Sequence, residues 1–161
     1  DKYNKWSTYT PEDDAVMLVY GSMYGNTEAT ANVLMTKLAE EGVKNIVAYS
    51  VSNTHVSYLI AEAFRCSHIV LAAPTYNNGI FTPMENFLLD LKAHGLQNRT
   101  YAIIENGTWA PVSGCQMMNI VQEMKDSKII GSTFTLKSSL KECQVEQLNC
   151  LAKEIAKQVN N

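Results

Sequence analysis

The sequence lacks three features that would point to particular classes of protein: paired cysteines, a surplus of positive charge and a long apolar run. Its cysteines stand far apart and form no Cys-x-x-Cys pair; they are Cys66, Cys115, Cys143 and Cys150. Scattered cysteines predict free thiols in a reducing, cytoplasmic compartment. The net charge of −3 gives no basic footprint for nucleic acid, and no apolar run approaches the ~20 residues of a membrane span. We therefore expect neither nucleic acid nor a membrane as a partner.

Histidine is scarce, and the sequence begins without a methionine. The three histidines, His55, His68 and His94, are widely separated, so we expect surface or core positions for them and predict no metal site. Because the chain begins at Asp1, the lack of a visible signal peptide carries no information about targeting.

The chain does contain a regular alternation of two kinds of segment. Its 161 residues, 46% apolar and 18% charged, suit one domain with a sizeable core. Short apolar runs predict buried strands at Ala15 to Tyr20, Ile46 to Val51, His68 to Ala73, Tyr101 to Glu105 and Ile129 to Leu136. Each run is followed by apolar residues at helical spacing. The predicted buried helix faces are Ala31, Leu34, Met35 and Leu38; Val56, Leu59, Ile60 and Ala63; Met84, Phe87, Leu88 and Leu91; Met117, Ile120, Val121 and Met124; and Val145, Leu148, Ala152, Ile155 and Val159.

Strands that alternate with helices predict an α/β fold, a doubly wound parallel sheet with helices on both faces. Residues 15–161 form this predicted domain. Residues 1–14 are polar with interleaved aromatics, which predicts a linker or tail, either docked or solvated. Helix ends are also marked: Thr82-Pro83-Met84-Glu85 forms a capping box with proline at the first helical position, and Gly42 and Gly95 suit the position just after a helix.

The segment Gly21 to Thr27 joins the first predicted strand to the first predicted helix, Glu28 to Glu41. The first N–H groups of a helix have no partner inside it, and the helix dipole adds partial positive charge there, so phosphate binding is favoured. The segment matches neither of two common phosphate-binding motifs. Asn26 stands where the mononucleotide P-loop has its lysine, and the third glycine of the Gly-x-Gly-x-x-Gly motif is missing. Hydroxyl and amide donors without a cation suit a single terminal monophosphate; the alternative is an ordinary turn without a ligand.

Two further loops follow the third and fourth predicted strands, from Pro74 to Phe81 and from Asn106 to Pro111. In an open doubly wound sheet, ligands bind at the carboxyl ends of the strands, where the winding reverses. Each loop carries a large aromatic residue, Tyr76 or Trp109, beside Asn, Gly and Thr. These residues predict a stacking surface for a flat ligand whose edge meets N–H and amide groups; the alternative is that the aromatics fold back onto the core. A monophosphate site beside an aromatic, amide-rich cleft describes flavin mononucleotide (FMN).

Three motifs carry a resemblance to a known family: Ser22-Met23-Tyr24-Gly25-Asn26-Thr27, Ala73-Pro74-Thr75-Tyr76-Asn77-Asn78-Gly79 and Asn106-Gly107-Thr108-Trp109-Ala110-Pro111. Over about residues 14–160 the chain resembles a flavodoxin, most closely the C-terminal flavodoxin-like domain of the flavodiiron (A-type) flavoproteins. The opening Tyr3-x-x-Trp6 is similar to the segment that joins the two domains in that family. The resemblance implies FMN as cofactor and a five-stranded sheet in the order 2-1-3-4-5, the order known for flavodoxin.

The resemblance also implies site residues. The flavin phosphate would be held by Ser22, Met23, Tyr24, Gly25, Asn26 and Thr27. The isoalloxazine ring would be flanked by Pro74, Thr75, Tyr76, Asn77, Asn78 and Gly79, and by Asn106, Gly107, Thr108, Trp109 and Ala110. Trp109 is the predicted stacking side chain, with Tyr76 or Met23 on the other face of the ring. No catalytic residue is predicted.

In the flavodiiron family, the flavin takes electrons from a rubredoxin or a reductase and passes them to a diiron centre that reduces O2 or NO. The resemblance implies the same partners here. This chain has no His-x-Glu-x-Asp-His pattern for the iron ligands, so we expect an electron-transfer domain that is an oxidoreductase only within a larger chain. Alternatives are a stand-alone flavodoxin, a flavodoxin-like quinone reductase and, more distantly, a flavin-free signalling module. A receiver domain fits poorly, because Asp13 and Asp14 precede the first strand and Ala73-Pro74 ends the third.

The sequence departs from the resemblance in its charge balance. Free-standing flavodoxins are usually strongly acidic, whereas this chain has 13 Lys+Arg against 16 Asp+Glu. Glu105, at the end of the fourth predicted strand, is open to two interpretations. It either lies near the flavin and affects its reduction potential, or it caps a turn, and we favour the second.

Overall fold

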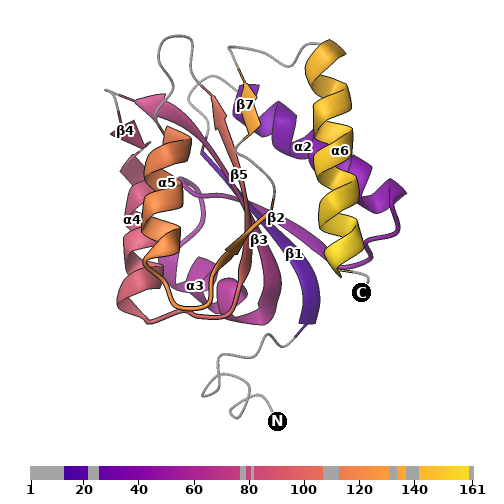
Figure 1. The fold of residues 1–161 in the computed structure, drawn as a ribbon. Coiled ribbons are helices and arrows are strands. Elements are labelled where there is room, and N and C mark those ends of the chain that lie inside the picture. Colours follow the sequence, from indigo (N-terminus) through magenta and orange to yellow (C-terminus); the bar gives the residue numbers. More distant parts are fainter. Residues whose placement is uncertain are drawn as a thin grey trace.

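The computed structural model describes residues 13–21, 26–76, 79–80, 82–106, 113–130, 134–136 and 142–159. Within them strands and helices alternate along the chain, as predicted (Figure 1). The strands are β1 (Asp13–Tyr20), β2 (Ile46–Ser50), β3 (Cys66–Tyr76), β4 (Gly79–Ile80), β5 (Thr100–Asn106), β6 (Lys128–Ile129) and β7 (Phe134–Leu136). The helices are α2 (Asn26–Glu40), α3 (Val56–Arg65), α4 (Thr82–Ala93), α5 (Ser113–Gln122) and α6 (Glu142–Val159).

The main sheet has the strand order β2-β1-β3-β5-β6, and every neighbouring pair along it is parallel. β7 also pairs with β5 in parallel, beyond β6, so the two short strands share the fifth position of the sheet. This confirms the predicted order 2-1-3-4-5. The order turns back at β1, because β2 lies on one side of it and all later strands lie on the other.

Two layers of helices enclose the sheet. α3, α4 and α5 cover one face, and α2 and α6 lie side by side on the other (Figure 1). Alternate residues of the central strands face opposite layers: Met17 and Val19 belong to the first core cluster, and Val16 and Leu18 to the second. All four are at most 1% exposed. The strands therefore carry continuous apolar runs because both of their faces are buried.

Glycines end two of the helices as predicted. Gly42 and Gly95 have φ values of 92° and 71°, which glycine adopts without steric cost. In each case the next N–H group reaches back to the last turn: Val43 donates to the Leu38 carbonyl at 3.1 Å, and Leu96 to the Leu91 carbonyl at 3.2 Å. These are Schellman closures that use carbonyls otherwise left without a partner.

Two local predictions were wrong, and a third element is described only in part. Pro74 to Phe81 was predicted as an irregular loop, but β3 extends to Tyr76 and pairs antiparallel with β4, because Thr75 lies opposite Ile80 and Tyr76 opposite Gly79. The predicted strand Ile129 to Leu136 is described in two parts, β6 and β7, and residues 131–133 between them lie outside the described residues. Val56, predicted to be buried, is 36% exposed because it stands in the first turn of α3.

Candidate functional site

The carboxyl ends of β1, β3 and β5 lie in a row along the upper edge of the sheet in Figure 1. The Gly21 N–H, just after β1, donates to the Ala72 carbonyl of β3 at 2.8 Å. On the other side of β3, Pro74 is the register partner of Asn106, the last residue of β5. Neighbouring strands are about 4.8 Å apart, so the three predicted ligand-binding segments leave the sheet next to one another.

The structure describes seven of the residues predicted to bind the cofactor. Asn26 and Thr27 open α2, Pro74, Thr75 and Tyr76 end β3, Gly79 begins β4, and Asn106 ends β5. The others lie outside the described residues: Ser22, Met23, Tyr24, Gly25, Asn77, Asn78, Gly107, Thr108, Trp109 and Ala110. The described strand ends and the start of α2 are brought to one edge, and the individual binding roles stay predictions.

Tyr20 and Glu28 connect the end of β1 to the first turn of α2. The Tyr20 hydroxyl lies 3.5 Å from Oε1 of Glu28. Burial raises the pKa of Tyr20, and the nearby carboxylate of Glu28 raises it further. Tyr20 therefore stays protonated at neutral pH and can donate to Glu28, which links the strand to the helix that follows the predicted phosphate loop.

Glu105 forms a second link at this edge. Its side chain is buried, and its Oε2 accepts a hydrogen bond of 2.7 Å from the Gly114 N–H in the first turn of α5. A carboxylate at a helix start pairs with an N–H that has no partner inside the helix. This contact agrees with the favoured interpretation of Glu105 as a capping residue. Its partner stands nine positions later, and local sequence patterns do not reveal a pairing at that distance.

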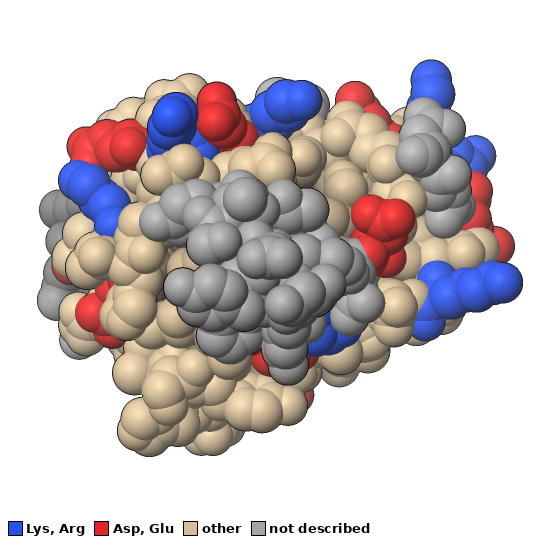
Figure 2. Space-filling model, turned by 90° about the horizontal axis from the view of Figure 1, so that it is seen from below, with Lys and Arg blue, Asp and Glu red and all other residues tan. Residues whose placement is uncertain are grey.

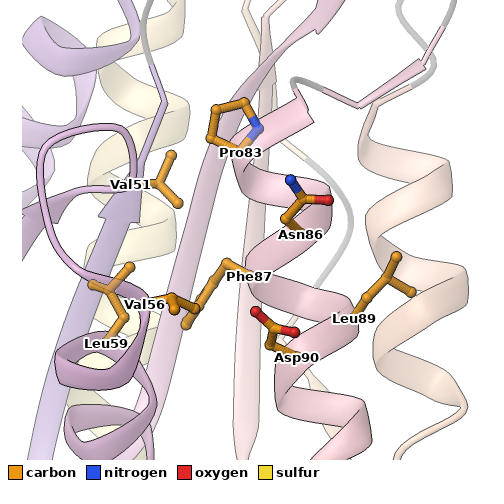
Figure 3. Close-up of a pocket in the computed structure, with 8 residues that line it drawn as sticks. All are labelled: Val51, Val56, Leu59, Pro83, Asn86, Phe87, Leu89 and Asp90. Atoms are coloured by element: carbon orange, nitrogen blue, oxygen red, sulfur yellow. The ribbon is translucent and has the colours of Figure 1, made fainter.

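One hollow that the described residues line lies away from the strand ends. It has a volume of about 530 Å³ and lies between α3 and α4, where Val56, Leu59 and Phe87 point into it (Figure 3). A second hollow of about 490 Å³ continues along the same two helices towards Phe64 and His94. Neither is lined by a residue predicted to bind the cofactor.

The histidines and charged side chains of the described residues form no metal-binding cluster. On the face of the molecule opposite the strand ends, acidic and basic side chains are interspersed (Figure 2). His55 caps α3 by accepting from the Ser57 N–H at 3.2 Å, His68 is buried in β3, and Nδ1 of His94 lies 2.8 Å from the Asp90 carbonyl oxygen. No three His, Cys, Asp or Glu side chains of the described segments lie close enough to hold a metal. No helix among them is both long and apolar enough to cross a membrane.

The donor set at the sheet edge fits FMN. The helix that follows β1 directs its first N–H groups to this edge, and such groups suit a phosphate ester. The Gly21 N–H is already bonded within the sheet, so the phosphate donors are expected later in that segment. The adjoining ends of β3 and β5 bring backbone groups of two neighbouring strands together, an arrangement that suits the edge of a flat ring.

Two sequence comparisons show which known proteins this chain resembles. The family model described as Flavodoxin matches residues 18–148. An uncharacterized protein of Methanocaldococcus jannaschii is 30% identical over 88 residues, which cover 55% of this chain and 22% of that protein.

Solved structures resemble the whole fold. Rubredoxin oxygen:oxidoreductase from Desulfovibrio gigas has a TM-score of 0.88 at 23% identity, over 98% of this chain and 39% of that one. The flavodiiron protein from Giardia intestinalis has a TM-score of 0.85 at 17% identity, over 99% of this chain and 39% of that one. A flavodoxin from the domain Archaea has a TM-score of 0.79 at 19% identity, over 91% of this chain and 99% of that one.

These likenesses differ in extent. The chain spans 22% of its curated relative and 39% of the two flavodiiron chains, but nearly the full length of the archaeal flavodoxin. At these identities the structural likeness concerns the fold. The family model matches 131 residues, from 18 to 148, of the 161. The chain therefore belongs to the flavodoxin family and is a flavodoxin-like, FMN-binding electron-transfer domain.

Proposed function

We propose that this chain is the flavin domain of a flavodiiron-type protein. It takes electrons from a rubredoxin or a reductase and passes them to a diiron centre held by another domain, where O2 or NO is reduced. The observation that carries this proposal is the extent of the fold match. Almost the entire chain, 98%, corresponds to 39% of rubredoxin oxygen:oxidoreductase, with a TM-score of 0.88.

The second candidate is a stand-alone flavodoxin, and one observation favours it. The archaeal flavodoxin corresponds to 91% of this chain over 99% of its own length, although with a lower TM-score of 0.79. Both candidates share one task, which is to bind FMN and exchange electrons with a docked protein. They differ in the protein that donates electrons and in the protein that accepts them, so the experiment below tests a particular electron donor.

Bound FMN supplies the redox chemistry, and the chain sets its orientation, access and electrostatic surroundings. On the proposed site, the start of α2 faces the phosphate, and the ends of β3 and β5 hold the two segments that flank the ring. A bound phosphate and apolar stacking disfavour extra negative charge on the ring, which lowers the potential for full reduction. The chain needs no general acid or base for this task.

The test begins with the purified chain and FMN. The flavin-loaded chain is mixed rapidly with reduced rubredoxin, and the bleaching of the flavin absorbance is followed. We expect reduction of the flavin by rubredoxin, and no fast turnover with NADPH and a quinone. Fast NADPH–quinone turnover would instead identify a quinone reductase and overturn the proposal. Failure to bind FMN at all would favour a flavin-free module.

The proposed compartment is the cytoplasm. Among the described residues, Cys115 and Cys150 are exposed free thiols. Exposed free thiols persist in reducing surroundings, which supports the proposal. Locating the tagged native protein by cell fractionation tests it, and recovery in an oxidising compartment would contradict it.

A further inference from the structure

β2 forms one edge of the sheet, and its outer side has no partner strand among the described residues. It stands first in the strand order and pairs with β1 alone. At its two ends, the Asn45 carbonyl and the Val51 N–H both bond to β1, each at 2.9 Å. Successive residues of a strand turn their N–H and C=O groups to opposite sides. The main-chain groups of Ile46, Ala48 and Ser50 therefore point outward, away from β1.

Most of these outward groups lack a hydrogen-bond partner within the described part of the chain. The Ser50 carbonyl accepts from the Asn53 N–H at 3.2 Å. The Ser50 N–H and both groups of Ile46 and of Ala48 are bonded to no described residue. Such a row of unpaired donors and acceptors is a template on which another strand can pair.

The sequence of β2 contains none of the devices that keep a sheet edge from pairing. Those devices include charged side chains, proline and bulges. β2 reads Ile-Val-Ala-Tyr-Ser, with all five residues partly exposed, and its pairing with β1 runs without a shift in register. Because the strand carries no charge, an identical strand can approach it without repulsion between like charges.

Tyr58 of α3 enlarges the surface beside this edge. Its side chain is 53% exposed, and its ring meets the ring of Tyr49 in β2 edge to face, with centroids 5.4 Å apart. The Tyr49 hydroxyl in turn donates to Oε2 of Glu62 at 2.8 Å, which fixes the position of its ring. An ordered aromatic pair therefore stands on the α3 side of the unpaired edge, and aromatic side chains are enriched at protein interfaces.

The β2 edge is complementary to itself. A two-fold axis through Ala48 sets a second copy antiparallel to the first, with Ala48 opposite Ala48 and Ser50 opposite Ile46. The outward groups then meet as hydrogen-bonded pairs. Val47 and Tyr49 both lie on the α3 side of the strand, and this register places one opposite the other. An aromatic residue opposite a β-branched one is a stabilising cross-strand pair.

We propose that the β2 edge is an interaction surface for a second copy of this chain, and that two copies pair their β2 strands antiparallel about Ala48 to form one continuous sheet. Tyr49 and Tyr58 of both copies cover the α3 side of the junction. One pair of short strands buries less than the roughly 1,200–2,000 Å² of a standard interface, so we expect a weak dimer with a Kd of about 10–100 µM. The proposal requires neither FMN nor an electron donor.

Sedimentation velocity of the full 161-residue chain tests the dimer. We expect a monomer at about 1 µM and mostly dimer at about 500 µM. Ala48→Pro removes the central outward N–H and none of the bonds to β1, and proline is accepted on the open side of an edge strand. The symmetric pairing then loses a hydrogen bond from each copy, so dimerisation should weaken about tenfold or more. The circular dichroism spectrum should remain that of the folded chain.

Two further variants serve as control and as a test of the aromatic pair. Ala48→Val adds similar bulk but keeps the N–H, so its Kd should stay within about twofold of the unsubstituted value. If it weakens the dimer as much as Ala48→Pro does, bulk is the cause and the proposal is wrong. Tyr58→Ala should weaken the dimer about fivefold; an unchanged Kd would place the contact elsewhere and contradict the proposal.

Hydrogen exchange measured residue by residue locates the contact. Protection of the Ala48 amide should rise with protein concentration, because pairing gives that N–H an acceptor. The Val47 and Tyr49 amides are turned towards β1 and should be protected at every concentration, which makes them an internal reference. A dimer whose Ala48 amide exchanges as fast as in the monomer overturns the proposal, and so does a chain that remains monomeric at about 500 µM.

Discussion

Arg99 should stabilise the fold more than any exposed charge, because its buried guanidinium binds backbone carbonyls of two separate segments. Its side chain is 2% exposed. The guanidinium donates to the carbonyls of Ala63 at 3.0 Å and Phe64 at 2.8 Å, in the last turn of α3. It also donates to those of Gln97 at 2.8 Å and Asn98 at 3.0 Å, in the turn before β5. Arg99 therefore ties the end of one helix to the start of a central strand.

The charge suits this place for a physical reason. The carbonyls at the end of a helix have no partner within it and carry partial negative charge. A buried guanidinium supplies hydrogen-bond donors to these carbonyls and a positive charge beside their negative one. Burial lowers the pKa of Arg99, and Tyr101 and Cys66 act in the opposite direction. The side chain keeps its proton, because a guanidinium is not deprotonated inside proteins.

Arg99→Met tests this interpretation, because it keeps the length of the side chain and removes every donor. Each hydrogen bond to a charged group is worth about 1.5–3 kcal/mol, but keeping the ion buried costs several kcal/mol. We therefore expect a net loss of about 2–4 kcal/mol in the free energy of unfolding. Arg99→Lys retains the charge but lacks the planar fork, so its loss should be smaller, about 1–2 kcal/mol.

Urea unfolding followed by circular dichroism measures both losses. With a slope of about 2 kcal/mol per molar urea, Arg99→Met should lower the midpoint by about 1–2 M. The control is Lys92→Met, which removes an exposed cation paired with Glu123 and should change stability by less than about 1 kcal/mol. If Arg99→Met is as stable as Lys92→Met, the four carbonyls find other partners and the reasoning is refuted.

Three further predictions concern the site and the response to pH. Trp109→Ala should weaken FMN binding by about 1–3 kcal/mol; equal affinity in a fluorescence titration would remove Trp109 from the ring. The pair Ser22→Ala, Thr27→Ala should weaken binding of FMN more than that of riboflavin, which lacks the phosphate, and equal losses would argue against the phosphate loop. Burial lowers the pKa of His68, with Asp14 opposing, so the unfolded chain takes up the proton first as pH falls below about 6.5 and stability declines there. Urea midpoints measured across this pH range should decline less in His68→Gln than in the unsubstituted chain, and should decline as before in His94→Gln. If the two variants give the same pH profile, the prediction is wrong.

Much of the fold was predictable because the central strands are buried on both faces of the sheet and therefore appear in the sequence as continuous apolar runs. The five strand positions and their order were confirmed, and Gly42 and Gly95 end their helices with positive φ. The hairpin of β3 and β4 was missed because β4 has only two residues, too few for any periodicity. Val56 was misplaced because helical spacing alone does not say whether another element covers the first turn of a helix.

The candidate site was predictable only in part. The convergence of three loops follows from parallel strands, whose carboxyl ends share an edge. The Glu105–Gly114 link joins residues nine apart, across the end of a strand and the start of a helix, and no local pattern encodes it. The roles of Trp109 and of the phosphate-loop residues stay predictions that the proposed titrations test.

Arg99 and Glu105 occupy opposite ends of the same central strand, and this separation has a consequence for mutagenesis. Arg99 lies at the entrance to β5, beside the last turn of α3, where the chain begins β3 at Cys66. Glu105 lies at the exit of β5, one residue before a predicted ring segment. Both are buried charged groups that bind backbone, yet only one stands at the ligand edge. Loss of Arg99 should therefore lower stability without altering FMN affinity measured well below the unfolding transition.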